Sequence, residues 1–272
     1  MPSRSHQHTR TPGLGVASFW LVSVLAVGCS HPFTTPVSEP RPARPVLGSS
    51  SAPQVSGAMR PSTAATARVF GRSVKGRPLV SYWAGDHSAS RRVLVIGVIH
   101  GNEAAGLPIA QALRSVRPTH SELVVVPNLN PDGTVLRTRQ NANGVDLNRN
   151  FPWHWMAAGR PGDQQYPGRA ALSEPESQAL ARLIKDLRPT LTVWFHQPVG
   201  VIDESGGSIA VERRFAQLAG EPLRQLTRYQ GSAVSWENAL LPHTTAFVVE
   251  LTKNVTPEQR RQLEAAVTDL AH

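Results

Sequence analysis

The sequence feature that most constrains the fold is an apolar run, Val93 to Ile99, that stops at His100 and is followed three residues later by Glu103. A continuous apolar run of this kind is typical of a strand buried on both faces of a parallel sheet. Ligands of open α/β sheets bind where such strands end, and imidazole with carboxylate suits Zn²⁺. On its own, this pair is more often an ordinary strand-to-helix turn than a metal site.

The segments around this run alternate between strand and helix patterns. Two short runs, Arg68 to Val74 and Pro78 to Ala84, predict a hairpin that leads into the apolar strand. Ala104 to Ser115 has helical apolar spacing, and Glu122 to Pro127 reads as a second buried strand. Strand, helix and strand in this order imply a right-handed parallel crossover. The pattern predicts an α/β fold with a mixed, mainly parallel β-sheet flanked by helices.

Two further helices are predicted in the second half of the chain. Ser173 to Arg188 begins with a serine that is followed three residues later by Glu176, the arrangement of a capping box, and Pro189 closes it. Pro257 to Ala271 is predicted to form a terminal helix. Both are expected among the helices that flank the sheet.

Two more apolar strands end in a residue that can bind a metal or a proton. Leu191 to Phe195 is followed by His196, and Ala246 to Val249 is followed by Glu250. A carboxylate at the end of an apolar segment is costly unless it has a partner or a task. Separately, each is more often a satisfied polar residue than a functional one. Together with the HxxE pair they have the composition of a catalytic zinc site that keeps one position open for water.

A polar loop, Arg137 to Pro152, has no hydrophobic period and follows an Asn-Pro-Asp-Gly turn at 130–133. It carries Arg137, Arg139 and Arg149. From composition alone it is a solvated loop.

Five motifs then follow one another along the chain. They are HGNE at 100–103, NPDG at 130–133, TRQNANGVDLNRNFP at 138–152, the histidine of FHQP at 196, and VVELT at 248–252. In this order and spacing they resemble the zinc carboxypeptidase family that includes carboxypeptidase A, and within it the bacterial murein peptide amidases. The resemblance covers most of residues 68–272. It implies a zinc carboxypeptidase-like α/β/α fold and a hydrolase, either a metallocarboxypeptidase or a murein peptide amidase.

The resemblance also implies a metal site. His100, Glu103 and His196 match the residues that hold one Zn²⁺ ion in the family. Asp146 matches a carboxylate that orients the first histidine, the usual outer partner of a metal-bound imidazole.

Other matching residues are implied to act on the substrate. Glu250 matches the general base, and Arg139 matches the arginine that stabilises the oxyanion. Asn148 and Arg149 match the pair that binds the free substrate carboxylate, for which a planar guanidinium is well suited. The family also has a mobile tyrosine shortly before the general base. Here that region is shortened, and Tyr229 is either the corresponding substrate-binding residue or a surface or packing residue.

The amino terminus predicts export. Residues 1–28 have the layout of a signal peptide, with Arg4 and Arg10 before an apolar run, Val16 to Gly28, that is too short to span a bilayer comfortably. Cys29 falls where a bacterial lipobox places its lipidated cysteine. We expect a lipoprotein anchored to a membrane on the periplasmic or cell-surface side of the cell envelope, with cleavage without lipidation as the alternative.

Residues 29–65 are rich in Pro, Ser, Ala and Thr and predict a disordered tether, which leaves 66–272 as the catalytic domain. Residues 1–65 hold five arginines and one glutamate, so almost half of the net charge of +9 lies outside that domain. No basic run is interleaved with aromatic residues, so we expect no nucleic-acid partner.

The leading substrate prediction is a murein peptide of the cell-wall peptidoglycan, cleaved between γ-D-glutamate and meso-diaminopimelate beside a free carboxylate. A general metallocarboxypeptidase or an acyl-amino-acid deacylase is the alternative, and a non-catalytic wall-binding lipoprotein is a second one. Asp203 and Glu204 are possible discriminators, because an acid in the substrate pocket would suit the extra amine of diaminopimelate.

Overall fold

One mixed β-sheet organises the part of the chain that the computed structural model describes, residues 65–272. Its strands within this part are β1 (Thr66–Arg72), β2 (Pro78–Gly85), β3 (Arg92–Ile96), β4 (Glu122–Val126), β5 (Leu191–His196), β6 (Val199–Asp203), β7 (Leu223–Arg224) and β8 (Thr245–Thr252). Their order across the sheet is β1-β2-β4-β3-β5-β8-β6-β7. The predicted signal peptide, the lipobox cysteine Cys29 and nearly all of the tether lie outside the described residues.

The centre of the sheet is parallel. β4, β3, β5 and β8 are successive neighbours that run in the same direction. β2 joins β4, and β6 joins β8, in antiparallel pairs. Every residue of β4 and β5 is buried, in keeping with their mainly apolar sequences. The predicted mixed, mainly parallel sheet is confirmed, and so is the hairpin, which β1 and β2 form.

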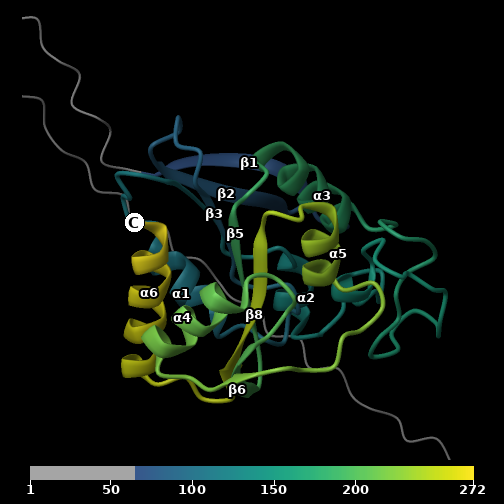
Figure 1. Ribbon diagram of the computed structural model, residues 1–272. Helices are drawn as coiled ribbons and strands as arrows, with labels where there is room; N and C mark the ends of the chain where they lie inside the picture. The colour runs from purple at the N-terminus through teal and green to yellow at the C-terminus, as the bar shows by residue number, and fades with distance from the viewer. Residues whose placement is uncertain (1–64) are drawn as a thin grey trace, which may run out of the picture. The chain divides into compact units, whose positions relative to one another are not determined.

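Helices cover both faces of the sheet. They are α1 (Gly106–Leu113), α2 (Pro131–Leu136), α3 (Pro175–Leu187), α4 (Ile209–Ala219), α5 (Ala233–Leu240) and α6 (Pro257–Ala271), with a short 3₁₀-helix η1 (Leu147–Arg149). Figure 1 shows α1, α4 and α6 on one side of the sheet and α3 and α5 on the other. The fold is therefore a three-layer α/β/α arrangement, as predicted.

Alternation along the strands divides the core between these two layers. Val93 and Val95 of β3 pack in the cluster that contains residues of α1, α4 and α6. Leu94 and Ile96 pack in the cluster that contains residues of α3 and α5. Successive side chains of a strand point to opposite faces, so a strand with a helix layer on each side is apolar on both faces, with a polar side chain only where it finds a buried partner.

The predicted capping box at Ser173 is wrong. The N-cap of α3 is Glu174, and it makes no side-chain capping bond. Proline favours the first helical position because it has no N–H to satisfy, and Pro175 therefore sets the start of the helix. Glu176 is fully buried and accepts a hydrogen bond from the backbone N–H of Val74, which joins the helix to the β1–β2 hairpin.

Three boundaries also differ from the prediction. The strand after Arg91 ends at Ile96, so residues 97–99 form an irregular connection to His100. β8 runs two residues beyond Glu250, because this part of the strand pairs with β6. The Asn-Pro-Asp-Gly segment initiates α2 rather than a simple turn, with Asn130 as the N-cap.

Among residues 65–272, the longest apolar helical stretch falls short of what a membrane crossing requires.

Candidate active site

The pairing of β5 with β8 brings two predicted site residues together. In this parallel pair His196 lies opposite Glu250, so the two side chains leave the same face of the sheet. That face is the one on which Trp194 and Val248 pack towards α3 and α5. Strand register alone therefore places an imidazole beside a carboxylate.

The turn that follows β3 is held by the start of α2. The side-chain amide of Asn130 donates hydrogen bonds to the carbonyl groups of Ile99 (3.0 Å) and Arg139 (3.3 Å). A Cβ atom on Gly101 would lie 2.0 Å from the carbonyl carbon of Gly133, so this position requires glycine. The NPDG motif thus packs against the HGNE motif and fixes the turn that carries His100 and Glu103.

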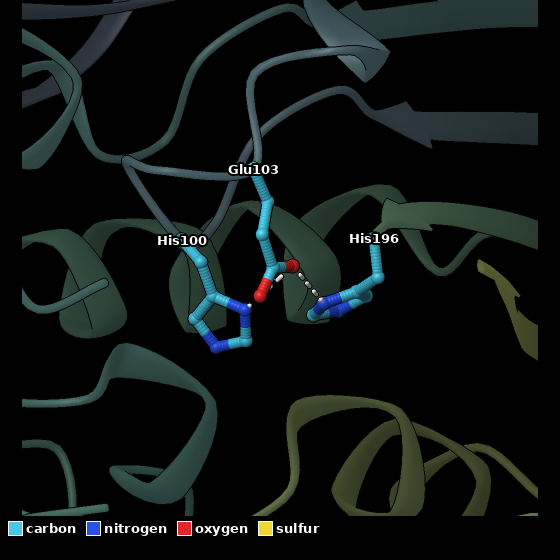
Figure 2. A group of neighbouring side chains, drawn as sticks. All are labelled: His100, Glu103 and His196. Atoms are coloured by element: carbon cyan, nitrogen blue, oxygen red, sulfur yellow. Dashed lines mark hydrogen bonds and ion pairs between the residues drawn. The ribbon is translucent and has the colours of Figure 1, made fainter. Parts of the chain in front are cut away.

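His100, Glu103 and His196 form a compact group (Figure 2). Oε2 of Glu103 lies 2.9 Å from Nδ1 of His100 and 3.1 Å from Nδ1 of His196. The two imidazole rings meet edge to face with centroids 4.8 Å apart. The histidine side chains are buried, and that of Glu103 is 12% exposed. One potential ligand atom from each residue lies within 4.8 Å of the others.

These three residues fit a metal ion of the zinc type. Two imidazoles and a carboxylate are a usual donor set for Zn²⁺. Nδ1 of His100 is buried and faces only the carboxylate of Glu103, and Nε2 of His196 is buried without a hydrogen-bond partner within the described part of the chain. One carboxylate is shared between two buried imidazoles here, and buried polar atoms normally find a full set of partners, so this donor set favours a ligand at this position. The prediction that the three residues come together is met by the geometry.

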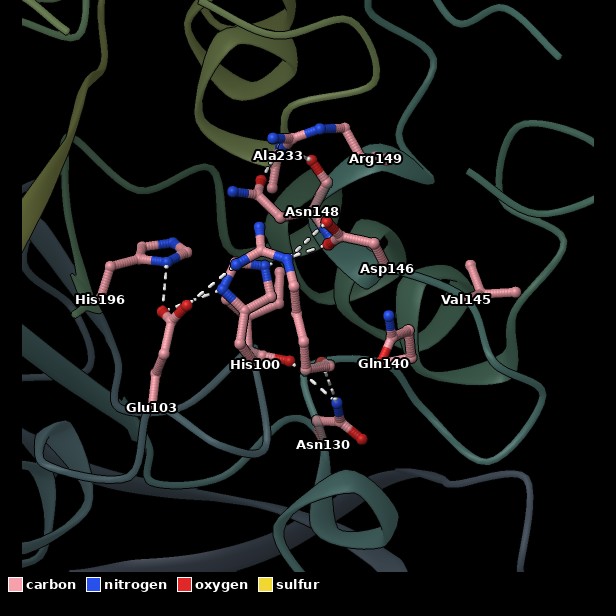
Figure 3. A network of polar contacts seen from close by, with 12 residues as sticks. His100, Glu103, Asn130, Gln140, Val145, Asp146, Asn148, Arg149, His196 and Ala233 are labelled. Carbon is pink, nitrogen blue, oxygen red and sulfur yellow. Dashed lines mark hydrogen bonds and ion pairs between the residues drawn. The ribbon is translucent and has the colours of Figure 1, made fainter. Parts of the chain in front are cut away.

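Asp146 fixes the orientation of His100 from behind (Figure 3). Its Oδ1 lies 3.0 Å from Nε2 of His100 and accepts a 2.9 Å hydrogen bond from the backbone N–H of Asn148. Its Oδ2 accepts a 2.9 Å hydrogen bond from Nε of Arg139. Although burial raises the pKa of the Asp146 carboxyl, the neighbouring His100 and Arg139 hold it well below its usual range. An ionised carboxylate at Nε2 directs Nδ1 of His100 towards Glu103.

Arg139 links this carboxylate to the candidate metal group. A second nitrogen of its guanidinium lies 2.9 Å from Oε1 of Glu103. Burial raises the pKa of Glu103, but its contacts with His100 and His196 bring that pKa well below the usual range. Arg137, the neighbouring arginine of the same loop, is exposed and does not line the cavity described below. The structure therefore separates the two arginines that the sequence left close together.

Asn148 and Arg149 lie on the same side of the cavity, in η1. The side-chain oxygen of Asn148 accepts a 2.9 Å hydrogen bond from the backbone N–H of Ala233, the first residue of α5. Arg149 is buried, and its Nε has no partner among the described residues. Its guanidinium carbon lies 4.2 Å from the centre of the Tyr229 ring, a cation–π contact. The structure thus brings Tyr229 to the predicted carboxylate-binding pair.

A close backbone contact sets this position of Tyr229. The carbonyl of Gly231 accepts a 3.0 Å hydrogen bond from the N–H of Phe151, and its own N–H donates to the carbonyl of Trp153. A Cβ atom on Gly231 would lie 1.9 Å from the carbonyl oxygen of Arg149. Only glycine allows this approach, which holds the segment before α5 against the arginine-containing loop.

Glu250 faces the same cavity as the candidate metal group. One of its carboxylate oxygens, Oε2, is buried and has no hydrogen-bond partner in residues 65–272. Burial raises the pKa of Glu250, and the nearby His196 only partly offsets this. A carboxylate with a raised pKa and a free oxygen is suited to accept and return a proton.

The cavity has a volume of about 330 Å³ and collects the predicted residues. All of them except Asp146, which lies behind His100, line it: His100, Glu103, Arg139, Asn148, Arg149, His196, Tyr229 and Glu250. Of the two acids proposed as discriminators, Asp203 lines the cavity and Glu204 does not.

Sequence reasoning missed other residues of this wall, notably Ser205 and Arg228. Neither lies in a periodic segment or in one of the five motifs. Arg228 directly precedes Tyr229, which is the one sequence signal that could have drawn attention to it. The position of both depends on how the segments after β6 and β7 fold back onto the site.

Comparison with known proteins agrees with this geometry. A family model described as zinc carboxypeptidase matches residues 57–211. The murein peptide amidase A of Escherichia coli K12 is 37% identical over 182 residues, which cover 61% of this chain and 74% of that protein. The murein peptide amidase A of Vibrio campbellii is 32% identical over 218 residues, covering 75% and 86%. The resemblance predicted from the motifs is confirmed.

Solved structures show the same fold. The murein-tripeptide amidase of Escherichia coli O157 superimposes with a TM-score of 0.62 at 29% identity, covering 75% of this chain and 91% of that one. A carboxypeptidase A from Helicoverpa armigera gives a TM-score of 0.66 at 20% identity, covering 77% and 68%. The second similarity concerns the fold alone.

Proposed function

Because this chain belongs to the zinc carboxypeptidase family, we propose that it hydrolyses an amide bond beside a free carboxylate, namely the γ-D-glutamyl-meso-diaminopimelate bond of murein peptides. It is a hydrolase of the metallopeptidase class. The observation that carries the proposal is the buried His100, Glu103 and His196 group with Glu250 facing the same cavity. The similarity to two murein peptide amidases supports the choice of substrate.

In this proposal His100, Glu103 and His196 hold one Zn²⁺ ion. The ion supplies Lewis-acid chemistry that polarises a carbonyl and makes water a nucleophile near neutral pH. Asp146 keeps Nε2 of His100 occupied, so that Nδ1 is the nitrogen left to bind metal. Nothing else in the cavity wall offers a comparable combination of two histidines and a carboxylate.

Glu250 moves the proton. Its unpartnered Oε2 accepts a proton from the attacking water, and the same carboxyl returns it to the leaving amine. The guanidinium of Arg139 stabilises the negative charge that develops on the carbonyl oxygen. Its contacts with Glu103 and Asp146 hold it in place before substrate binds, which lowers the cost of reorganisation during the reaction.

Asn148 and Arg149 bind the free carboxylate of the substrate, next to the bond that is cleaved. The guanidinium of Arg149 forms two parallel hydrogen bonds with a carboxylate more readily than an ammonium group does. Tyr229 stacks on this guanidinium and covers the bound carboxylate. A carboxylate at this point limits the substrates to those with a free end beside the scissile amide.

The test uses the full-length, zinc-loaded protein and the tripeptide L-alanyl-γ-D-glutamyl-meso-diaminopimelate. Mass spectrometry is expected to detect the release of diaminopimelate, and the Glu250→Gln protein is expected to release almost none. An intact tripeptide, together with trimming of ordinary peptides from their carboxyl end, would replace this proposal by a general carboxypeptidase. Equal activity of the Glu250→Gln protein would instead indicate a non-catalytic, wall-binding role.

We also propose that the protein is exported and anchored in the cell envelope through a lipid on Cys29. The support is the lipobox-like sequence, which lies at the end of the predicted signal peptide. Incorporation of labelled fatty acid into the parent chain and into a Cys29→Ala variant tests it. We expect label in the parent only; an unlabelled parent that is nevertheless shortened at this site indicates secretion without lipidation.

A further inference from the structure

Besides the predicted site residues, the cavity wall carries one further acid and one further base. Asp203 is the last residue of β6 and is half-buried, and Arg228 lies in the segment between β7 and α5 and is exposed. Both line the same cavity as His196 and Glu250. The cavity therefore presents two opposite charges that the candidate metal group and the carboxylate-binding pair do not use.

Both carboxylate oxygens of Asp203 accept hydrogen bonds that fix the orientation of its side chain. Oδ1 accepts a 2.7 Å hydrogen bond from the backbone N–H of Leu226, and Oδ2 accepts a 2.7 Å bond from the hydroxyl of Ser205. That hydroxyl in turn accepts a 3.1 Å hydrogen bond from the N–H of Val248 in β8. A carboxylate has about four acceptor sites, so Asp203 is fixed in place and retains the capacity to bind a ligand.

Arg228 is anchored to the same loop through hydrogen bonds to backbone carbonyl groups, which do not neutralise its positive charge. Its guanidinium donates hydrogen bonds to the carbonyl of Ser205 and, at 2.7 Å, to the carbonyl of Glu204. These acceptors are backbone groups rather than carboxylates, and an arginine has five N–H donors. The remaining donors are available to an anion, and Ser205 fixes the spacing between the two charges because it contacts both residues.

We propose that Asp203 and Arg228 form a paired-charge subsite that recognises a substrate side chain ending in both an ammonium group and a carboxylate. Asp203 accepts hydrogen bonds from the ammonium, and Arg228 donates to the carboxylate. The distal end of diaminopimelate carries both groups, whereas lysine carries the ammonium alone. This inference rests on the proposed function, and it identifies the residues that select the third residue of the peptide.

The experiment compares two tripeptides that differ only in having meso-diaminopimelate or lysine at the third position. With the full-length zinc-loaded protein, Arg228→Gln is expected to raise KM for the diaminopimelate peptide about 10- to 100-fold and to leave the lysine peptide unaffected. Asp203→Asn is expected to raise KM for both peptides by a similar factor, while kcat stays within a few-fold of the parent value. Unchanged KM values in both variants overturn the subsite.

Two nearby residues of the same charge provide matched control variants. Glu204 and Arg224 have the same charges as Asp203 and Arg228 but do not line the cavity, so Glu204→Gln and Arg224→Gln are expected to leave both KM values unchanged. Asparagine at position 203 retains an oxygen for the N–H of Leu226, which preserves the fold. An equal rise of KM in the controls contradicts the assignment, because it would reflect general surface charge.

Calorimetric binding of free meso-diaminopimelate separates this inference from the proposed function. If the parent cleaves the tripeptide but Asp203→Asn and Arg228→Gln bind diaminopimelate as the parent does, the subsite alone is wrong. If the parent leaves the tripeptide intact while these variants bind the free amino acid more weakly, the subsite stands and the proposed reaction is wrong.

Discussion

Glu250 and the candidate metal ligands have separable tasks at the scale of single residues. In the proposed mechanism Glu250 accepts a proton, and it lies outside the contacts that join His100, Glu103 and His196. We therefore expect Glu250→Gln to lower kcat by about 10²- to 10⁴-fold, the usual contribution of a general acid–base group. Bound zinc, measured by atomic absorption, is expected to equal that of the parent. Loss of zinc together with loss of activity would assign Glu250 a role in metal binding.

Asp146 is expected to act on the metal through His100. Since it directs Nδ1 of His100, Asp146→Asn should weaken zinc binding about 10- to 100-fold, measured by competition with a coloured chelator. Asp186 is an exposed aspartate of α3, and Asp186→Asn is the matched control, with unchanged affinity. Equal zinc affinity in the parent and in Asp146→Asn would show that backbone packing alone orients the histidine.

At the scale of the elements, α5 is joined to β5 by a buried acid. Glu237 of α5 is fully buried and accepts hydrogen bonds from the hydroxyl of Thr192 (2.5 Å) and the indole N–H of Trp194 (3.1 Å). Burial raises its pKa to about 7, despite these two hydrogen bonds. Both donors belong to β5, the strand that ends in His196. Ionisation of Glu237 therefore changes the hydrogen bonds that hold α5 to the strand carrying this candidate metal ligand.

This acid predicts a pH dependence of stability. A carboxyl whose pKa is higher in the folded than in the unfolded state binds a proton more tightly when folded. Its stabilising contribution is complete below the unfolded pKa and is lost as the pH rises through about 7. Between pH 4.5 and pH 8 the free energy of unfolding should fall by about 3 kcal/mol more in the parent than in Glu237→Gln. Urea unfolding at these pH values measures this, and parallel curves for the two proteins would contradict it.

The elements also show which parts of the molecule the sequence could predict. The central strands were predictable because a parallel strand between two helix layers is mainly apolar on both faces, and the residues that end these strands pointed to His196 and Glu250. The shift of the α3 start from Ser173 to Glu174 was not foreseen, because Pro175 outweighed the capping-box pattern. The contribution of Arg228 could not be foreseen either, because it depends on contacts between loops that have no periodicity.

At the scale of the whole molecule, zinc should stabilise the folded chain. The candidate ligands are distant in sequence and converge only after β3 and β5 have paired, so an ion that they bind favours the folded state. Free zinc at about 1,000 times its dissociation constant should add about 4 kcal/mol, measured as a rise in Tm over the chelated protein. The rise should vanish in His196→Ala, and an equal Tm with and without chelator would contradict the assignment of the site.

The parallel register of β5 and β8 makes the centre of the molecule intolerant of changes in chain length. His196 lies opposite Glu250, and side chains alternate between faces, so deleting one residue of β8 before Glu250 would turn that carboxylate towards α4 and α6. Phe247 and Val249 occupy that side. Substitutions within these two strands leave the register intact, whereas an insertion or deletion within them would separate His196 from Glu250, so we expect changes in chain length to be tolerated only in the loops.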